Sequence, residues 1–302
     1  MHTIRQNKWW IIQIHAEWTG LTIESILLEK WQLPKKLVHS WRMAKSVLLN
    51  GHPANWRQPL EPMNRVAVPF FESGPFGAAP VPPSPSILYE DDHLIVANKP
   101  AGVKTHPNEL EEKNTLLNGV CYHVSLSGDL LPVRHIHRLD EGTSGAVLFA
   151  KHDAAYTALS RLLEKKEIFR TYYAVVDGQV SKRSGTIRKA IGKDRHHPSR
   201  RRISPNGQTA VTHFERMAVQ NGLSLLKCRL ETGRTHQIRV HLSSIGHPIS
   251  GDVLYGGRGM NGNPLLHAAE LTIPHPFVND CVTVTAPVPE SIKKLFLPTY
   301  FE

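Results

Sequence analysis

One stretch of this chain divides it in two. Residues 71–86 contain five prolines, two glycines and three serines, a composition typical of an extended linker. All six tryptophans lie before this stretch, between Trp9 and Trp56. We therefore expect an N-terminal unit at residues 1–70, a proline-rich linker at residues 71–86 and a larger unit at residues 87–302.

The N-terminal unit is expected to be a small α+β domain. Apolar residues recur at helical spacing after Thr22 and again after Pro34, which predicts two short helices. Asn50-Gly51 is a strong turn signal, and the alternating residues Arg65–Val68 predict a strand. Two short helices followed by a small sheet are the expected order.

The charge of the chain indicates a polyanionic partner. It has 36 Lys and Arg against 26 Asp and Glu, a net charge of +10, which favours nucleic acid or an anionic membrane surface. No apolar run of about 18 residues spans a bilayer, and the first residues lack the apolar core of a signal peptide. We therefore expect a cytoplasmic, monomeric protein that binds nucleic acid and not membranes.

Two segments carry this charge. Residues 1–70 have a net charge of +5 and residues 181–206 a net charge of +8. The second segment has little apolar content, so we expect a mobile loop that binds nucleic-acid phosphates. The residues expected to bind them are Lys182, Arg183, Arg200, Arg201 and Arg202.

The three cysteines, Cys121, Cys228 and Cys281, are odd in number and far apart. This argues against a disulfide framework and against a zinc site. We expect reduced thiols, with Cys228 in the core.

A candidate catalytic carboxylate lies in residues 135–145. Arg138 and Asp140 precede two glycines and a Thr-Ser pair, which indicates a tight turn. The apolar residues 146–150 follow directly and predict a buried strand. Asp140 is therefore expected on a loop held by the core.

Two later stretches supply further candidates. Tyr172 lies on a predicted strand that ends at Asp177-Gly178, and Arg234 lies on a strand-to-helix turn. Thr235 is the expected cap of the helix that follows Arg234, as Asp153 is of an earlier helix.

Three motifs, in this order, carry a family resemblance. They are His-Arg-Leu-Asp-x-x-Thr-Ser-Gly from His137, Tyr-x-Ala-x-Val-x-Gly from Tyr172, and Gly-Arg-Thr-His-Gln-Ile-Arg-Val-His from Gly233. Over roughly residues 87–290 the chain resembles the RluA-like family of pseudouridine synthases. The resemblance implies an α+β fold with a mixed, largely antiparallel central sheet. Residues 1–70 are similar to the family's N-terminal S-four-like RNA-binding domain, with Met63-Asn64 in place of its usual Gly-Asp.

The resemblance also implies roles for the candidate residues in turning uridine into pseudouridine. Asp140 acts at the ribose, Arg234 holds that carboxylate in its ionised form, and Tyr172 retains the detached base. Arg138 fills the gap left by the flipped nucleotide or binds phosphate. Neither a metal nor another cofactor is expected, and whether Asp140 acts as nucleophile or as base stays open. We expect 23S ribosomal RNA as the substrate, with transfer RNA as the alternative.

Two other classes of protein compete with this interpretation. A metal-dependent hydrolase would use histidines such as His135, His137, His236 and His241 together with Asp140 as ligands, but the neighbouring arginines would repel a cation. A catalytically silent RNA-binding protein would have no use for an intact set of Asp140, Tyr172 and Arg234.

Overall fold

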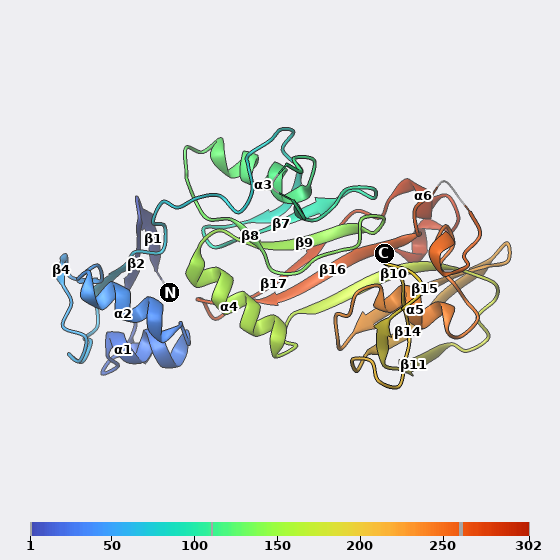
Figure 1. Ribbon diagram of the computed structural model, residues 1–302. Coiled ribbons are helices and arrows are strands. Elements are labelled where there is room, and N and C mark those ends of the chain that lie inside the picture. Colours follow the sequence, from blue (N-terminus) through green and yellow to red (C-terminus); the bar gives the residue numbers. More distant parts are fainter. Residues whose placement is uncertain (1, 110, 260–261, 302) are drawn as a thin grey trace.

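The computed structural model describes residues 2–109, 111–259 and 262–301 (Figure 1). In this part of the chain the strands form a five-stranded sheet, a ten-stranded sheet and a two-stranded hairpin. The small sheet and its helices lie beside the end of the long sheet. The predicted α+β class is confirmed. Within the described ranges, no helix is long and apolar enough to cross a membrane.

The small sheet has the strand order β1-β2-β5-β3-β4. The predicted helices are confirmed: Thr22 Oγ1 accepts a hydrogen bond from the Ser25 amide at 3.1 Å, and α2 follows Pro34. Asn50 and Gly51 form the expected turn, with φ of 51° and 84°. The elements are β1 (Thr3–Gln6), β2 (Trp9–Gln13), η1 (Ala16–Trp18), α1 (Ile23–Ser25), the π-helical turn η2 (Ile26–Lys30), α2 (Lys35–Met43), β3 (Leu48–Leu49), β4 (His52–Pro53) and β5 (Arg65–Val68).

The hairpin formed by β1 and β2 is an addition to the predicted order of elements. Trp10 and Ile12 are buried, whereas Trp9 and Ile11 are half-buried on the other face. Because both faces of β2 carry apolar side chains, the alternation that marks a half-buried strand is hidden in the sequence.

The long sheet has the order β11-β14-β15-β10-β16-β9-β7-β6, with β17 beside β16 and β8 beside β9. Its pairs in the described residues are antiparallel except for β9 with β16, which are parallel. The predicted mixed, largely antiparallel sheet is thus confirmed. The strands are β6 (Ser86–Glu90), β7 (Leu94–Lys99), β8 (Arg134–His135), β9 (Ser144–Ala150), β10 (Phe169–Asp177), β11 (Ser184–Arg188), β14 (Val211–Gln220), β15 (Leu223–Leu230), β16 (Leu266–Pro274) and β17 (Cys281–Thr285).

The parallel junction brings two of the predicted motifs together. Ala268 of β16 is in register with Gly145 of β9 on one side and with Tyr172 of β10 on the other. Gly145 has a φ of 113°, and a Cβ there would lie 2.2 Å from the Ala268 carbonyl oxygen, so glycine is required for this approach. The loop that ends at β9 therefore lies one strand away from Tyr172.

The helices of the larger unit are α3 (Leu116–Ser125), α4 (Asp153–Glu164), η3 (Val253–Tyr255), α5 (Gln237–Ser243), α6 (Glu290–Lys293) and η4 (Pro298–Tyr300). Two predicted caps are wrong. His152 rather than Asp153 caps α4: its Nδ1 accepts a hydrogen bond from the Ala155 amide at 3.2 Å. Helix α5 begins after His236 rather than after Thr235, because His236 adopts a left-handed φ of 58°.

The basic segment at residues 181–206 contains three paired strands, which corrects the expected mobile loop. Strand β11 pairs with β14 at the edge of the long sheet, and β12 (Ile191–Lys193) pairs with β13 (Arg201–Ile203). Ile191 and Ile203 pack with Ala210 and Val240 in a small core of their own. This core and the backbone pairing order the segment despite its charge.

The proline-rich stretch runs along the surface of the larger unit. The amide of Gly74 donates to the Leu130 carbonyl at 2.8 Å, and that of Val81 to the Asn118 carbonyl of α3 at 3.2 Å. Strand β6 follows. The stretch contains no helix or strand before β6 and is fastened to the larger unit at both places.

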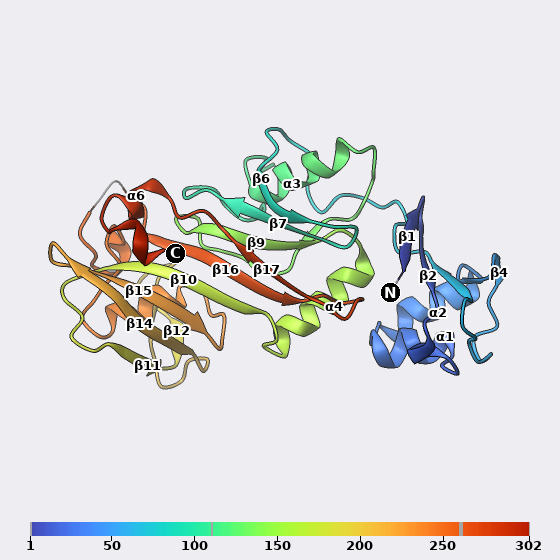
Figure 2. The ribbon, with the colours of Figure 1, turned by 180° about the vertical axis from the view of Figure 1, so that it is seen from behind.

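Aromatic side chains join the two units. Phe70 packs against Trp10 of the small sheet at 5.2 Å, against His152 at 4.9 Å and against Phe277 at 4.8 Å, measured between ring centroids. Helix α4 lies at the end of the long sheet that faces the small unit (Figure 2). From this helix, Arg161 Nη2 donates a hydrogen bond to the Trp31 carbonyl at 2.8 Å. All the tryptophans of the small unit except Trp9 thus belong to a core that the two units share.

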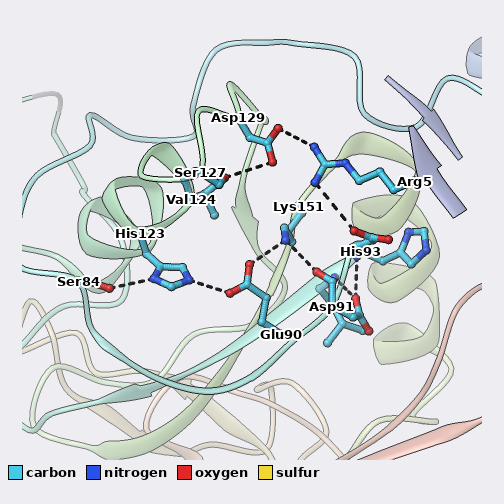
Figure 3. A network of polar contacts seen from close by, with 12 residues as sticks. Arg5, Ser84, Glu90, Asp91, His93, His123, Val124, Ser127, Asp129 and Lys151 are labelled. Atoms are coloured by element: carbon cyan, nitrogen blue, oxygen red, sulfur yellow. Dashed lines mark hydrogen bonds and ion pairs between the residues drawn. The ribbon is translucent and has the colours of Figure 1, made fainter. Parts of the chain in front are cut away.

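A polar network lies beside this shared core (Figure 3). Arg5 of β1 donates to Asp129 at 2.6 Å and lies 3.9 Å from Asp92. In the same view Lys151 is paired with Glu90 at 2.8 Å. The contacts of Arg5 with Asp129 and Asp92 connect β1 to two separate loops of the larger unit and fix the orientation of this strand.

Replacing Phe70 with alanine should lower the free energy of unfolding by about 3–5 kcal/mol, because a buried ring is lost and the cavity only partly collapses. The expected loss is measured by urea unfolding followed through tryptophan fluorescence. Phe169→Ala is the matched control: that ring is 62% exposed, so its loss should change stability by less than about 1 kcal/mol. Equal losses in the two variants would contradict the shared core.

Two histidines in the shared core predict a dependence of stability on pH. His93 Nδ1 lies 2.9 Å from His152 Nε2, and burial lowers the pKa of His93 to about 3 and that of His152 well below its usual value. In the unfolded chain both titrate near 6.5. As the pH falls from 6.5 towards 3 the unfolded state binds protons that the folded state refuses, so stability should fall by up to about 1.4 kcal/mol per pH unit for each ring.

His152→Asn isolates one of these rings. Asparagine also caps helices and takes up no proton in this range, so the variant should lose stability less steeply between pH 6.5 and 4. The measurement is the unfolding free energy at each pH. Buried histidines that do not touch His152 contribute equally to both proteins. Identical slopes would show that His152 binds the same number of protons in the folded and unfolded states.

Candidate active site

The loop that carries Asp140 is held by backbone and buried side-chain contacts on both sides. Thr105 Oγ1 donates to the Leu139 carbonyl at 3.0 Å and accepts from the Leu139 amide at 3.1 Å. The Glu141 carbonyl accepts from Lys99 Nζ and from the Gly102 amide, both at 2.8 Å. The two neighbours of Asp140 are therefore fixed, and so is the position of its carboxylate.

Lys99 is the buried cation under this loop. Its side chain also donates to the carbonyl of Pro100, at 3.0 Å. Burial lowers the pKa of Lys99 to about 8, against the opposing pull of Asp140 and Glu141. The resemblance of residues 87–102 to the opening of the family's catalytic domain predicts that Lys99 and Pro100 pack near the site, and the hydrogen bond from Lys99 to the loop of Asp140 agrees with this.

Asp140 is paired with Arg239 of α5. Arg239 Nη1 donates to Asp140 Oδ2 at 3.2 Å, while Nε and Nη2 hold Asp252 at 2.7 and 2.9 Å. Burial alone would lower the pKa of Arg239, but the hydrogen bonds and charge of Asp252, with those of Asp140, raise it. Asp252 thus orients the guanidinium, which in turn orients the Asp140 carboxylate.

His236 completes the surroundings of Asp140. Its Nε2 lies 3.8 Å from Asp140 Oδ2, and its Nδ1 lies 2.8 Å from the Tyr255 hydroxyl. Burial lowers the pKa of His236. Its left-handed φ of 58° is uncommon for a residue other than glycine and costs free energy that surrounding contacts must offset.

The predicted pairing of Arg234 with Asp140 is wrong. Arg234 Nε donates to the Thr209 carbonyl at 3.1 Å, and the ion-pair partners of Asp140 in the described ranges are Arg239 and His236. The left-handed turn at His236 separates Arg234 from the helix and places Arg239, in the first turn of α5, against the carboxylate. Arg234 still lines the same pocket.

Tyr172 lies in the pocket with Asp140. It is buried on β10, and burial raises the pKa of its hydroxyl, which is therefore neutral near pH 7. The pocket has a volume of about 390 Å³ and is lined by Asp140, Tyr172, Arg234 and Arg239, among others. This volume lies at the lower end of the range of about 300–1,000 Å³ found for small-ligand sites.

The predicted RNA-binding residues fall into three places. Arg138 is exposed and lines the pocket. Lys182 and Arg183 are exposed before β11 and are not among the residues that line the pocket. Arg200, Arg201 and Arg202 lie at the β12–β13 hairpin, where Arg200 pairs with Asp194 at 2.7 Å. The Arg201 amide donates to the Tyr255 hydroxyl at 2.8 Å, so this hairpin reaches the site through the partner of His236.

The histidines of the competing metal site have separate partners. The ring of His135 stacks on that of His106 at 4.2 Å, His137 Nε2 accepts from the Leu148 amide, and His241 binds Thr212 and the Lys189 carbonyl. Among the described residues, no group of three or more His, Cys, Asp or Glu side chains is arranged to hold a metal ion.

Two models of known protein families match this chain. Residues 93–244 match the model of the RNA pseudouridylate synthase family, and residues 10–66 that of the RluD ribosomal pseudouridine synthase N-terminal domain. The chain belongs to the RNA pseudouridine synthase family and is an isomerase.

Individual relatives cover nearly the whole chain. An uncharacterized RNA pseudouridine synthase of Bacillus subtilis, YhcT, is 42% identical over 293 residues, which are 96% of this chain and 97% of the relative. Ribosomal large subunit pseudouridine synthase D of Xanthomonas campestris is 34% identical over 91% of this chain and 88% of its own. Among solved structures, human RNA pseudouridylate synthase domain containing 1 is 28% identical, with a TM-score of 0.57, covering 73% of this chain and 89% of its own.

Proposed function

We propose that this protein converts specific uridines of structured RNA, in 23S ribosomal RNA, to pseudouridine. The observation that carries this proposal is the Asp140 carboxylate, held at 3.2 Å by Arg239 in a pocket shared with Tyr172. The reaction needs a fixed carboxylate at the ribose and an apolar surface for a loose base. The pocket combines both.

The reaction exchanges one bond for another. The bond from ribose C1′ to uracil N1 breaks, the uracil turns, and a bond from C1′ to C5 forms, while C5 loses a proton and N1 gains one. Asp140 acts at the ribose, either by attack on C1′ or by taking a proton from the sugar. The ring of Tyr172 retains the detached uracil, since stacking of a base on an aromatic ring contributes about 1–3 kcal/mol.

A uridine reaches this pocket by leaving its helix. Flipping a nucleotide out of a stack costs a few kcal/mol, and Arg138, exposed at the rim, fills the gap or binds a neighbouring phosphate. Arg234, which lines the same pocket, also contacts the substrate. Lys182, Arg183, Arg200, Arg201 and Arg202 extend the basic surface along which the RNA backbone lies.

The N-terminal unit, residues 1–70, serves as an RNA-binding domain, with residues 71–86 linking it to a catalytic domain at residues 87–302. Helix α2 and the residues after it expose Lys35, Lys36, His39 and Lys45, and lysines on one exposed surface are suited to phosphate binding. Because this unit shares a core with the larger one, it holds RNA at a fixed distance from Asp140.

Ribosomal RNA is favoured as the substrate by the two regions that match together. Residues 10–66 match an N-terminal domain named for ribosomal synthases, and relatives that span both units include ribosomal large subunit synthases. An enzyme that modifies ribosomal RNA works where ribosomes assemble, so we place it in the cytoplasm.

Unmodified 23S ribosomal RNA and a pool of unmodified transfer RNAs, both transcribed in vitro, test the proposal. Each is incubated with purified protein, digested to nucleosides and analysed for pseudouridine after chromatographic separation. Pseudouridine in the ribosomal RNA alone is the expected result. Conversion of the transfer RNA pool alone would show that transfer RNA, and not ribosomal RNA, is the substrate. Conversion of neither RNA by a folded protein that binds RNA would contradict the proposed activity.

A further inference from the structure

The pocket holds an arginine that the reaction described above leaves without a task. Arg170 and Tyr172 are two residues apart on β10, so their side chains leave the same face of the sheet, and both line the pocket with Asp140. Thr171, between them, is in register with Arg229 of β15. The side chain of Arg229 therefore lies on the opposite face, one strand away.

Arg170 has no partner for its charge in the described part of the chain. Its Nε is buried without a hydrogen bond, and no ion pair or side-chain hydrogen bond involves it among the described residues. Arg5, Arg200 and Arg239 each have a carboxylate at 3.2 Å or less. A partly buried guanidinium without such a partner carries a desolvation cost that a bound anion would offset.

Gly233 keeps one side of this guanidinium open. A Cβ at position 233 would lie 2.9 Å from Arg170 Nη1 and 3.5 Å from Nη2, although the φ of Gly233 is outside the left-handed region. The glycine therefore leaves room for the guanidinium, which is the flexible end of the Arg170 side chain. Any larger residue would displace the guanidinium from the wall of the pocket.

The charges around Arg170 leave it available for an anion from solution. Asp140 is held by Arg239, and Glu231, another carboxylate of the pocket, is held by His213 at 2.6 Å. His137 is neutral, because burial and the charge of Arg170 lower its pKa to about 3. The remaining carboxylate that lines the pocket, Glu164, is exposed.

We propose that Arg170 is a phosphate-binding site, which takes a backbone phosphodiester group of the RNA beside the nucleotide whose base enters the Asp140 pocket. A planar guanidinium donates two parallel hydrogen bonds to phosphate oxygens, which fixes orientation as well as affinity. The site rests on the proposed function for its ligand, since RNA supplies the phosphodiester. It would position the ribose of the target nucleotide against Asp140.

The site is tested first without RNA. The thermal midpoints of wild type, Arg170→Gln and the matched control Arg229→Gln are measured with increasing inorganic phosphate at constant ionic strength. The thermal midpoints of wild type and Arg229→Gln should rise equally with phosphate, and the midpoint of Arg170→Gln should rise less. Equal responses of all three would overturn the site, whatever RNA the enzyme acts on.

Binding of RNA then identifies the phosphate. On the RNA that wild type converts, Arg170→Gln should raise the apparent Kd and KM roughly ten- to a hundredfold, the usual range for one charged hydrogen-bonded contact, and lower the salt slope by about one. Arg170→Lys, which keeps the charge without the fork, should lie between wild type and Arg170→Gln. The expected effect on kcat is smaller than that on KM.

A neutral linkage separates RNA phosphate from free phosphate. Methylphosphonate is placed, one linkage at a time, at each linkage flanking the mapped uridine in a short RNA. One placement should weaken RNA binding by wild type and by Arg229→Gln but not by Arg170→Gln. Equal weakening of all three proteins at every placement would show that Arg170 binds free phosphate and not the RNA backbone. Absence of conversion by wild type would refute the proposed function instead, and the thermal measurement would still decide the site.

Discussion

Asp140→Asn is expected to reduce pseudouridine formation below detection while leaving the protein folded and able to bind RNA. The amide has nearly the size and hydrogen-bonding capacity of the carboxylate, but it neither attacks the sugar nor accepts its proton. The neighbours of Asp140 are held through Thr105 and Lys99 rather than through its side chain, so the loop should keep its place. The measurement is single-turnover conversion of RNA at saturating enzyme.

Asp92→Asn is the control for this change. Asp92 lies in the turn between β6 and β7, outside the residues that line the pocket, and the same exchange of carboxylate for amide there should leave conversion unchanged. Mass spectrometry of the Asp140→Asn enzyme after the assay checks that no amide has reverted to carboxylate. Normal conversion by an intact amide would refute the role of Asp140.

Arg239→Gln should produce the second large effect, on both activity and stability. It removes the cation from Asp140 and from Asp252, whose side chain is 1% exposed. Leaving a buried charge unpaired costs about 3–5 kcal/mol, and losing the group that orients the reacting carboxylate should lower kcat at least about a hundredfold. Urea unfolding and single-turnover rates measure the two effects.

Two further variants separate these effects. Arg239→Gln combined with Asp252→Asn removes the unpaired carboxylate, so it should recover part of the stability but not the activity. Arg234→Gln should leave stability within about 1 kcal/mol of wild type, because Arg234 donates to a carbonyl at the surface. If Arg234→Gln lost stability and Arg239→Gln did not, the pairing at Asp140 would be misassigned.

The sequence was sufficient to predict where the chemistry lies, because local signals and core patterns agree there. A turn with two glycines followed by a five-residue apolar run places Asp140 on a loop before a buried strand, and the structure has that strand as β9. Cys228 is buried as its alternation with Leu226 predicts. Tyr172 lies on β10, which corresponds to the strand predicted to end at Asp177-Gly178.

The partner of Asp140 was harder to predict, since it depends on one backbone angle. Both Arg234 and Arg239 stand in the third motif, and spacing alone does not show that His236 turns left-handed before α5 begins. That turn decides which arginine reaches the carboxylate. Asp252, which orients Arg239, is 13 residues further along the chain, beyond the reach of any local pattern.

The sequence predicted neither the order in the basic segment nor the packing of the two units against each other, and the reasons are related. A net charge of +8 over residues 181–206 hides Ile187, Ile191 and Ile203, which are enough to order one edge strand and one hairpin once β14 and α5 lie beside them. His93 and His152 stand 59 residues apart and look like ordinary surface histidines in the sequence. Their burial follows from the packing of Phe70 and Trp10 against them, which no single segment reveals.

The most direct test of the whole account is a map of pseudouridines in 23S ribosomal RNA from cells that lack this protein. Each site is located by chemical modification that blocks reverse transcription, in cells complemented with wild type, with Asp140→Asn or with no gene. The account predicts that one or more sites disappear without the gene, return with wild type and stay absent with an Asp140→Asn protein present at the same level. An unchanged map in the deletion strain, or full restoration by Asp140→Asn, would contradict it.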